Sequence, residues 1–403
     1  MNPYISLPDM VVAITMLLTI SAVMIPLARW LGIGPELGLL LSGIILGSSH
    51  FLNTSQVERL GDISQLGVVF FLFVIGLELD PRKIWSLRRY AFGLGAAQVL
   101  GTGLAMMFYW HFFAPSWSLA LLLGLVASNS STALVLQLLK SRGELEQDYG
   151  QATLALLLFQ DLTVVPILAL LPIFAGTGSA ESFAWVEVLY AVGAMIVIFV
   201  VGRYVWPQLL RLVVAPNFGE TFTAILFIAL FGGAWLASST GLSMAMGAFI
   251  AGVSLGSSEY RHRLEEEVLP LKNLLLGLFF VSVGLTVDLS VLSGNLARIL
   301  FHVIAIVAFK VVALYVAARA MSMQHGAAAR VSFLLAQCSE FAFVALGALL
   351  ALGSETQVQF SIGIIVVAVT MIMTPWLNAL GILWSRWDSP FVPKKEGLAQ
   401  VNR

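Results

Sequence analysis

Three charged side chains lie deep inside apolar runs of the sequence: Asp161, Lys310 and Glu340. A charge at the centre of a membrane helix costs about 2.5 to 3.5 kcal/mol on insertion scales, so each one needs a partner or a function. Asp161 follows Gln160 in LLLFQDLTVVPIL. A proton and a cation compete for such a carboxylate, because each neutralises the same charge. We therefore expect Asp161 to bind both, which is the minimum chemistry of antiport; the alternative is a structural ion pair with Lys310.

The other two deep charges have two interpretations each. Lys310 is the natural partner of Asp161: it either compensates the carboxylate when no cation is bound or itself releases a proton. Glu340 is expected to cap the N-terminus of the helical segment that follows it. The alternative is that Glu340 takes part in ion binding directly.

Polar clusters interrupt the spans around two of these sites. LLLGLVASNSSTALVLQLL contains Asn129, Ser130, Ser131 and Thr132, and FLLAQCSEFAFVALGALL contains Ser339 before Glu340. Backbone groups freed from a helix within a membrane must face a cavity or one another, so such clusters mark broken helices in transporters. We expect two broken helices that cross near the bilayer centre and offer helix ends and carbonyls to an ion. The alternative is a continuous helix whose hydroxyls bond back to its own carbonyls.

The composition indicates what kind of protein must hold these residues. Of 403 residues 59% are hydrophobic and only 11% are charged, with a mean hydropathy of +0.94, whereas soluble proteins carry about 25% charged residues. The chain is therefore expected to be an all-α polytopic membrane protein. A net charge of −1 argues against a nucleic-acid partner. The single cysteine excludes an internal disulfide, and no metal-ligand spacing or catalytic signature occurs, so we expect no enzyme and no cofactor besides transported ions.

Apolar runs between charge and turn clusters predict thirteen transmembrane helices. The predicted spans are 9–29, 34–52, 63–79, 90–111, 117–139, 149–175, 183–202, 220–238, 240–256, 273–291, 297–318, 331–351 and 357–385. An external N-terminus places 18 of the 21 basic residues in the cytoplasm, as the positive-inside rule requires. We thus expect a multi-pass protein of the plasma membrane, or of the inner membrane in a bacterium, with a cytoplasmic C-terminus.

Two pairs of segments indicate an internal repeat. SGIILGSSHF at 42–51 matches AGVSLGSSEY at 251–260, and LFVIGLELD at 72–80 matches FVSVGLTVD at 280–288. The offsets of 209 and 208 residues nearly agree, and the matched spans lie seven crossings apart, so the copies face opposite ways. This favours an inverted-topology repeat of the kind found in secondary transporters. The glycines alone would indicate only close helix packing.

A mixed-charge segment at 261–267 is predicted to be a cytoplasmic loop. It contains His262, Glu265, Glu266 and Glu267, which form either a solvated surface or a regulatory loop. Glu78 and Asp80, beside Arg82 and Lys83, are interpreted as a solvated cluster.

The segments LLLFQDLTVVPILALLPI, GLSMAMGAFIAGVSLGSSEYRHRLEEEVLPLKNLLLGLFFVSVGLTVDL and LLAQCSEFAFVALGAL resemble the membrane domain of Kef-type potassium efflux proteins, within the monovalent cation:proton antiporter family. The resemblance covers about 9–385. It implies a thirteen-helix fold, a homodimer, and an elevator-like motion of a six-helix core against a dimerisation scaffold.

The resemblance also implies roles for single residues. Asp161 resembles the family's ion-binding aspartate, and Gln160 the residue that distinguishes Kef-like members from sodium antiporters with paired aspartates. Lys310 resembles the lysine that pairs with that carboxylate. Ser130, Ser131 and Thr132 lie on the first crossing segment and Glu340 on the second. The segment from His262 to Glu267 resembles the acidic loop that contacts the regulatory domain in gated members.

The expected organisation follows from the spans and the resemblance. Scaffold helices occupy 1–86 and 206–293, the transport core occupies 88–175 and 296–386, a linking helix occupies 176–205 and a cytoplasmic tail occupies 387–403. Only 17 residues follow Arg386, and no Gly-x-Gly-x-x-Gly unit occurs there. We expect an ungated relative, a truncated form, or a regulatory domain supplied as a separate subunit, and glutathione gating is not carried over.

The sequence favours exchange of a monovalent cation, K⁺ first, for H⁺ by alternating access. Na⁺/H⁺ antiport and a channel-like K⁺ efflux protein are the alternatives. Solute symport would need basic or amide groups for an organic anion, yet Lys310 is the only deep basic residue. The expected partners are membrane lipid and a second copy of the chain.

Overall fold

The computed structural model describes residues 7–31, 33–48, 54–78, 85–114, 116–169, 171, 185–214, 219–240, 242–354 and 356–386, and within these ranges every regular element is helical. The expected tail at 387–403 and residues 176–184 of the expected linking helix lie outside the described residues, as do three members of the expected cluster near Glu78: Asp80, Arg82 and Lys83.

The helices of the first half run in the order α1 (Leu7–Trp30), α2 (Pro35–Ser48), α3 (Thr54–Glu78), the π-helical segment η1 (Arg89–Gly95), α5 (Ala96–Trp110), α6 (Trp117–Ser128), α7 (Thr132–Ser141) and α8 (Asp148–Ala169). The second half contains α10 (Trp185–Val200), η2 (Val201–Val205), α11 (Trp206–Val214), α12 (Gly219–Ser238), α13 (Met244–Gly256), α14 (Arg261–Leu285), α15 (Val291–Ala320), α16 (His325–Leu334), α17 (Phe341–Ala351), α18 (Gln357–Ile372) and α19 (Thr374–Ser385).

Seven of the described helical segments are long and apolar enough to cross a membrane, and α18 with α19, bent by 49°, would make an eighth. Five shorter apolar helices fall in the remaining predicted spans, so each predicted span contains an apolar helix. The multi-pass helical class is thereby confirmed, whereas thirteen crossings stay a prediction.

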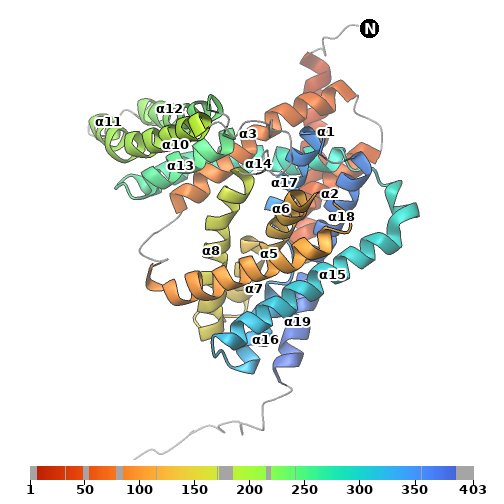
Figure 1. Ribbon diagram of the computed structural model, residues 1–403. Helices are drawn as coiled ribbons and strands as arrows, with labels where there is room; N and C mark the ends of the chain where they lie inside the picture. The colour runs from red at the N-terminus through yellow and green to blue at the C-terminus, as the bar shows by residue number, and fades with distance from the viewer. Residues whose placement is uncertain are drawn as a thin grey trace, which may run out of the picture.

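The helices form two sets of close neighbours. α3 packs against α13 and α14, and α2 packs against α14, while α12 packs against α13. In the other set, α5 packs against α6 and α15, and α15 also packs against α16 and α18. Figure 1 places α10 to α13 on one side of the molecule, and α15, α16 and α19 on another. The two predicted breaks belong to the set built around α15.

Glycine contacts between the matched segments are reciprocal. A Cβ on Gly43 of α2 would lie 2.9 Å from the Gly284 Cα of α14. A Cβ on Gly252 of α13 would lie 3.1 Å from the Gly76 Cα of α3. Gly43 matches Gly252, and Gly76 matches Gly284, so the two contacts are images of each other under the repeat. The packing interpretation of these glycines is confirmed, and the reciprocity is what an internal two-fold arrangement would produce.

We expect alanine at Gly43 or Gly252 to lower the thermal unfolding temperature of the detergent-solubilised protein. The new methyl groups would lie 2.1 Å from the Val281 carbonyl oxygen and 2.2 Å from that of Phe73, so the helix backbones must separate. Overpacking of this kind costs about 1–3 kcal/mol. Gly193→Ala in α10 is the control, because its Cβ would meet no atom within 4 Å. Equal unfolding temperatures for all three variants would contradict the close-packing argument.

Candidate ion-binding site

The first polar cluster breaks its helix. α6 ends at Ser128 and α7 begins at Thr132, and the residues between them are extended, with ψ of 154° at Asn129 and 113° at Ser131. The side chains of Asn129, Ser130 and Ser131 are buried. The expectation of a broken helix is confirmed here, and the continuous alternative is wrong.

The second cluster also breaks its helix. α16 ends at Leu334 and α17 begins at Phe341, with residues 335–340 outside either helix and buried. The two breaks touch, because the Ser130 hydroxyl donates a hydrogen bond of 2.8 Å to the Leu335 carbonyl oxygen. Two segments 205 residues apart therefore meet through irregular backbone.

Lys310 of α15 binds both breaks. Its ammonium donates to the Asn129 carbonyl oxygen at 2.6 Å, to the Gln337 carbonyl oxygen at 2.6 Å and to the Ser130 hydroxyl at 3.1 Å. Asn129 is the C-cap of α6, and Gln337 follows the end of α16. Helix C-termini carry negative partial charge, so a buried cation is favourable at this position.

The expected ion pair between Lys310 and Asp161 is absent. No ion pair within 4.0 Å joins these two described residues, and the three acceptors of Lys310 are neutral oxygens. The expectation was wrong because two of those acceptors are backbone carbonyls, which every residue carries whatever its type. The Lys310 ammonium thus balances the negative partial charge at the helix ends and not the charge of the Asp161 carboxylate.

Asp161 of α8 lies at the N-terminus of α7. The Thr132 hydroxyl, on the first residue of α7, lies 3.1 and 3.2 Å from the two carboxylate oxygens and donates to them. Helix N-termini carry positive partial charge and so favour an anion there. Among the described residues no other group donates a hydrogen bond to this partly buried carboxylate. Asp161 therefore keeps acceptor positions for a proton or a cation.

Gln160 supports the backbone of the first break. Its side-chain oxygen accepts from the Ser130 backbone N–H at 2.9 Å, and its amide nitrogen donates to the Gln98 side-chain oxygen at 2.7 Å. Gln98 in turn donates to the Ser128 carbonyl oxygen at 2.8 Å. This series of hydrogen bonds, from Gln98 through Gln160 to the Ser130 backbone, holds the extended residues of the first break in place. The Gln160 side chain therefore positions the backbone of the site. Sequence reasoning missed Gln98, although an amide within GAAQVLGTGLAMM was a visible signal.

Glu340 does not cap α17 with its side chain. It occupies the N-cap position, but no capping hydrogen bond forms. The Ser339 hydroxyl instead accepts from the Phe341 backbone N–H at 3.3 Å and lies 3.4 Å from a Glu340 carboxylate oxygen, to which it donates. The capping expectation was wrong because Glu340 has helical dihedral angles, with φ −56° and ψ −24°, whereas a capping side chain needs extended backbone. The alternative, direct ion work by the buried Glu340, stays open.

The predicted regulatory loop is helical. His262, Glu265, Glu266 and Glu267 all lie in the first turns of α14, because leucine, arginine and glutamate are good helix formers. Glu267 accepts a hydrogen bond of 2.9 Å from Thr223 of α12. This charged surface makes no hydrogen bond to either break within the described residues, and a regulatory role for it stays a prediction.

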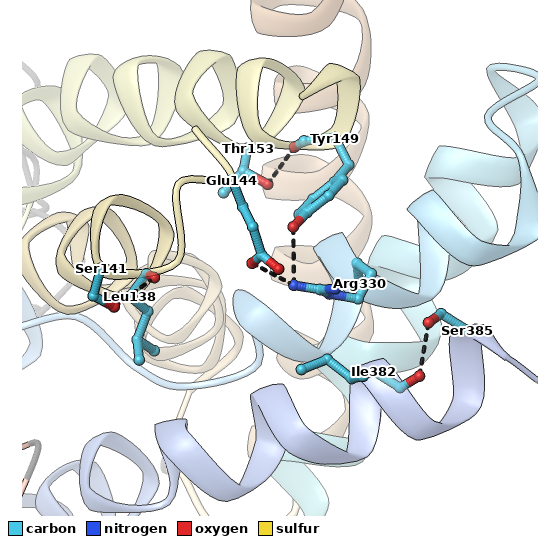
Figure 2. Close-up of polar contacts among 8 residues, drawn as sticks. All are labelled: Leu138, Ser141, Glu144, Tyr149, Thr153, Arg330, Ile382 and Ser385. Atoms are coloured by element: carbon cyan, nitrogen blue, oxygen red, sulfur yellow. Dashed lines mark hydrogen bonds and ion pairs between the residues drawn. The ribbon is translucent and has the colours of Figure 1, made fainter. Parts of the chain in front are cut away.

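An ion pair joins α16, the helix before the second break, to the segment between α7 and α8 (Figure 2). Arg330 of α16 binds the Glu144 carboxylate at 2.6 Å and the Tyr149 hydroxyl at 2.9 Å. Glu144 lies between α7 and α8, and Tyr149 is in the first turn of α8. The guanidinium also lies over the Tyr149 ring, 4.7 Å from its centroid. One side chain therefore ties α16 to the helix that carries Asp161.

A multi-pass helical fold in which two broken helices touch, with the Asp161 carboxylate at the end of one of them, is typical of a secondary transporter. The family model described as sodium/hydrogen exchanger, transmembrane, matches residues 16–379. The chain belongs to this family of monovalent cation:proton antiporters, which are transporters and not enzymes.

Solved structures agree on the fold. The chain is similar to a structure of the sodium proton antiporter MjNhaP1 from Methanocaldococcus jannaschii, with a TM-score of 0.67 and 16% identity over 93% of this chain and 98% of that one. A second structure of MjNhaP1 gives a TM-score of 0.61 and 15% identity over 94% and 95%. The expected antiporter family is confirmed, whereas the Kef-type subgroup stays a prediction.

Proposed function

We propose that this protein exchanges a monovalent cation for H⁺ at Asp161. The observation that carries the proposal is a partly buried carboxylate whose only hydrogen-bond donor among the described residues is Thr132, with no cationic side chain paired to it. A proton and a cation compete for its oxygens, so each bound species excludes the other. We also propose that Asn129, Ser130 and Ser131 take part in binding the cation together with Thr132, while Gln160 holds the Ser130 backbone in place.

The transported cation is proposed to be K⁺, with Na⁺ as the alternative. The proposal of K⁺ rests on Gln160, an amide at the position where the resemblance sets Kef-like members apart from sodium antiporters. Na⁺ is favoured by the description of the matching family and by the similar fold of a sodium proton antiporter. Selectivity depends on the size and ligand field of the site in its ion-bound form.

Alternating access is proposed to come from an elevator-like motion. The moving core would comprise 88–175 and 296–386, and the scaffold 1–86 and 206–293, with two copies associating through the scaffold. The division into two sets of packed helices supports this assignment. The reciprocal glycine contacts support an inverted repeat, and the two touching breaks would be its symmetry-related crossing helices. Thirteen crossings, an external N-terminus and a cytoplasmic C-terminus complete the proposal.

The experiment is a flux assay in proteoliposomes that hold a pH-sensitive dye. We expect an inward K⁺ or Na⁺ gradient to drive proton efflux, and an equal choline gradient to drive none. The ion that gives the lower half-saturating concentration across mildly acidic to alkaline pH identifies the preferred cargo. Cation flux without proton movement would overturn antiport and favour a channel.

A further inference from the structure

The Lys310 ammonium lies in a cage of neutral oxygens. The cage consists of the Asn129 carbonyl, the Gln337 carbonyl and the Ser130 hydroxyl, at 2.6, 2.6 and 3.1 Å from the nitrogen. Lys310 is completely buried, at 0% exposure. The three ammonium protons therefore meet three oxygens, and no carboxylate takes part.

These oxygens have the chemistry of a monovalent-cation site. Carbonyl oxygens bind such ions by replacing their hydration shell. Both carbonyls come from interrupted chain, where the loss of helical N–H partners leaves a carbonyl free to bind a cation. The end of α6 adds its negative partial charge to the cage.

A second observation concerns the side chain of Gln337, whose backbone carbonyl is part of the cage. The Gln337 side chain is completely buried, and neither its amide oxygen nor its amide nitrogen has a hydrogen-bond partner among the described residues. Buried polar groups are otherwise almost always paired. The residue that gives one carbonyl to the cage thus also carries an unpaired buried oxygen.

We propose that the Lys310 cage is a second monovalent-cation site, separate from Asp161, which the Lys310 ammonium fills as a tethered cation. A neutral amine would offer two protons to three oxygens and turn its lone pair toward one of them, so the cage requires the charged form. The wild-type chain then holds one exchangeable cation, at Asp161, and the positive charge at the two breaks stays constant. The inference rests on the proposed function only in counting Asp161 as the other site.

The test vacates the cage and counts bound ions. Equilibrium binding of radioactive Rb⁺ is measured per chain on the full-length protein in detergent, with ammonium as the competitor. We expect Lys310→Ala to bind about twice as much Rb⁺ as the wild type. Asp161→Asn should bind none, and the double variant should regain one ion per chain. Lys310→Met is the matched control, because its long apolar side chain fills the space without a charge and should add no site.

The outcomes separate the two proposals. Retention of the wild-type stoichiometry in Lys310→Ala, or equal gains in Lys310→Ala and Lys310→Met, would overturn the cage. Binding that survives Asp161→Asn with Lys310 intact would overturn the proposed function, while the gain on vacating the cage would still be measured. If Lys310→Ala does not survive purification in sodium buffers, it should survive in Rb⁺ or ammonium; loss under all conditions, with Lys310→Met recovered, also overturns the cage.

Discussion

Asp161→Asn is expected to reduce cation-driven proton flux in proteoliposomes to the level of protein-free vesicles. The asparagine amide has nearly the size of the carboxylic acid and can still accept from the Thr132 hydroxyl, which lies 3.1 Å from the nearer oxygen of Asp161. It can neither carry a negative charge nor bind and release a proton. The fold should therefore persist, while the exchange of one positive species for the other has no group on which to occur.

The control is a second aspartate outside the membrane-spanning helices. Asp288 is exposed between α14 and α15, where hydrogen bonds from the Ser290 hydroxyl and backbone N–H lower the pKa of its carboxyl. Asp288→Asn makes the same change in net charge, far from either break along the chain, and should leave flux within about a factor of two of the wild type, as expected for a surface substitution. Appreciable flux in Asp161→Asn, at equal reconstituted amounts, would remove Asp161 from the mechanism.

The energetic cost of polar groups in a membrane makes the site visible in the sequence. Deep charges and polar clusters are expensive there, so Asp161, Lys310 and the residues around Asn129 stand out from the apolar runs that contain them. The two breaks lie where those clusters predict them. The bend between α18 and α19 was missed because the run at 357–385 was interpreted as one span, although Pro375 at the start of α19 was a visible signal for it.

Partners of the deep charges could not be predicted in the same way. Lys310 binds carbonyl oxygens, which side-chain types do not reveal, and the sequence suggested Asp161 as its partner by charge alone. Gln160 likewise acts through Gln98 and the Ser130 backbone, a network set by packing of α8 against neighbouring segments. The charged start of α14 was assigned to a loop because polarity was weighed above helix propensity.

The ion pair between Arg330 and Glu144 joins the two broken helices at one end. Arg330 lies in α16, the helix that ends at the second break. Its partners Glu144 and Tyr149 lie where the chain passes from α7, which carries Thr132, to α8, which carries Asp161. Only 13% of the Arg330 side chain and 17% of the Glu144 side chain are exposed. Removal of one partner therefore leaves a charge in a largely buried position, which makes the pair costly to break.

We expect Arg330→Gln to lower the free energy of unfolding by about 2–3 kcal/mol, somewhat below the cost of breaking a fully buried pair because part of each side chain reaches solvent. Glu144→Gln should cost less, since Arg330 keeps the Tyr149 hydroxyl at 2.9 Å and its contact with the ring. The double variant should be more stable than the sum of the single changes predicts, because no unpaired charge remains. Thermal unfolding of the purified protein, with detergent and lipid held constant, measures all three.

Ser385→Ala is the matched control in the same region (Figure 2). Its hydroxyl donates a 2.7 Å bond to the Ile382 carbonyl oxygen of its own helix, so its loss should change stability by no more than about 0.5 kcal/mol. Additive effects of Arg330→Gln and Glu144→Gln would show that the two charges do not depend on each other. Coupling between them would mean that α16, and with it the second break, is held to α8 by electrostatics. In that case both breaks would move together with Asp161, as transport by a rigid core requires.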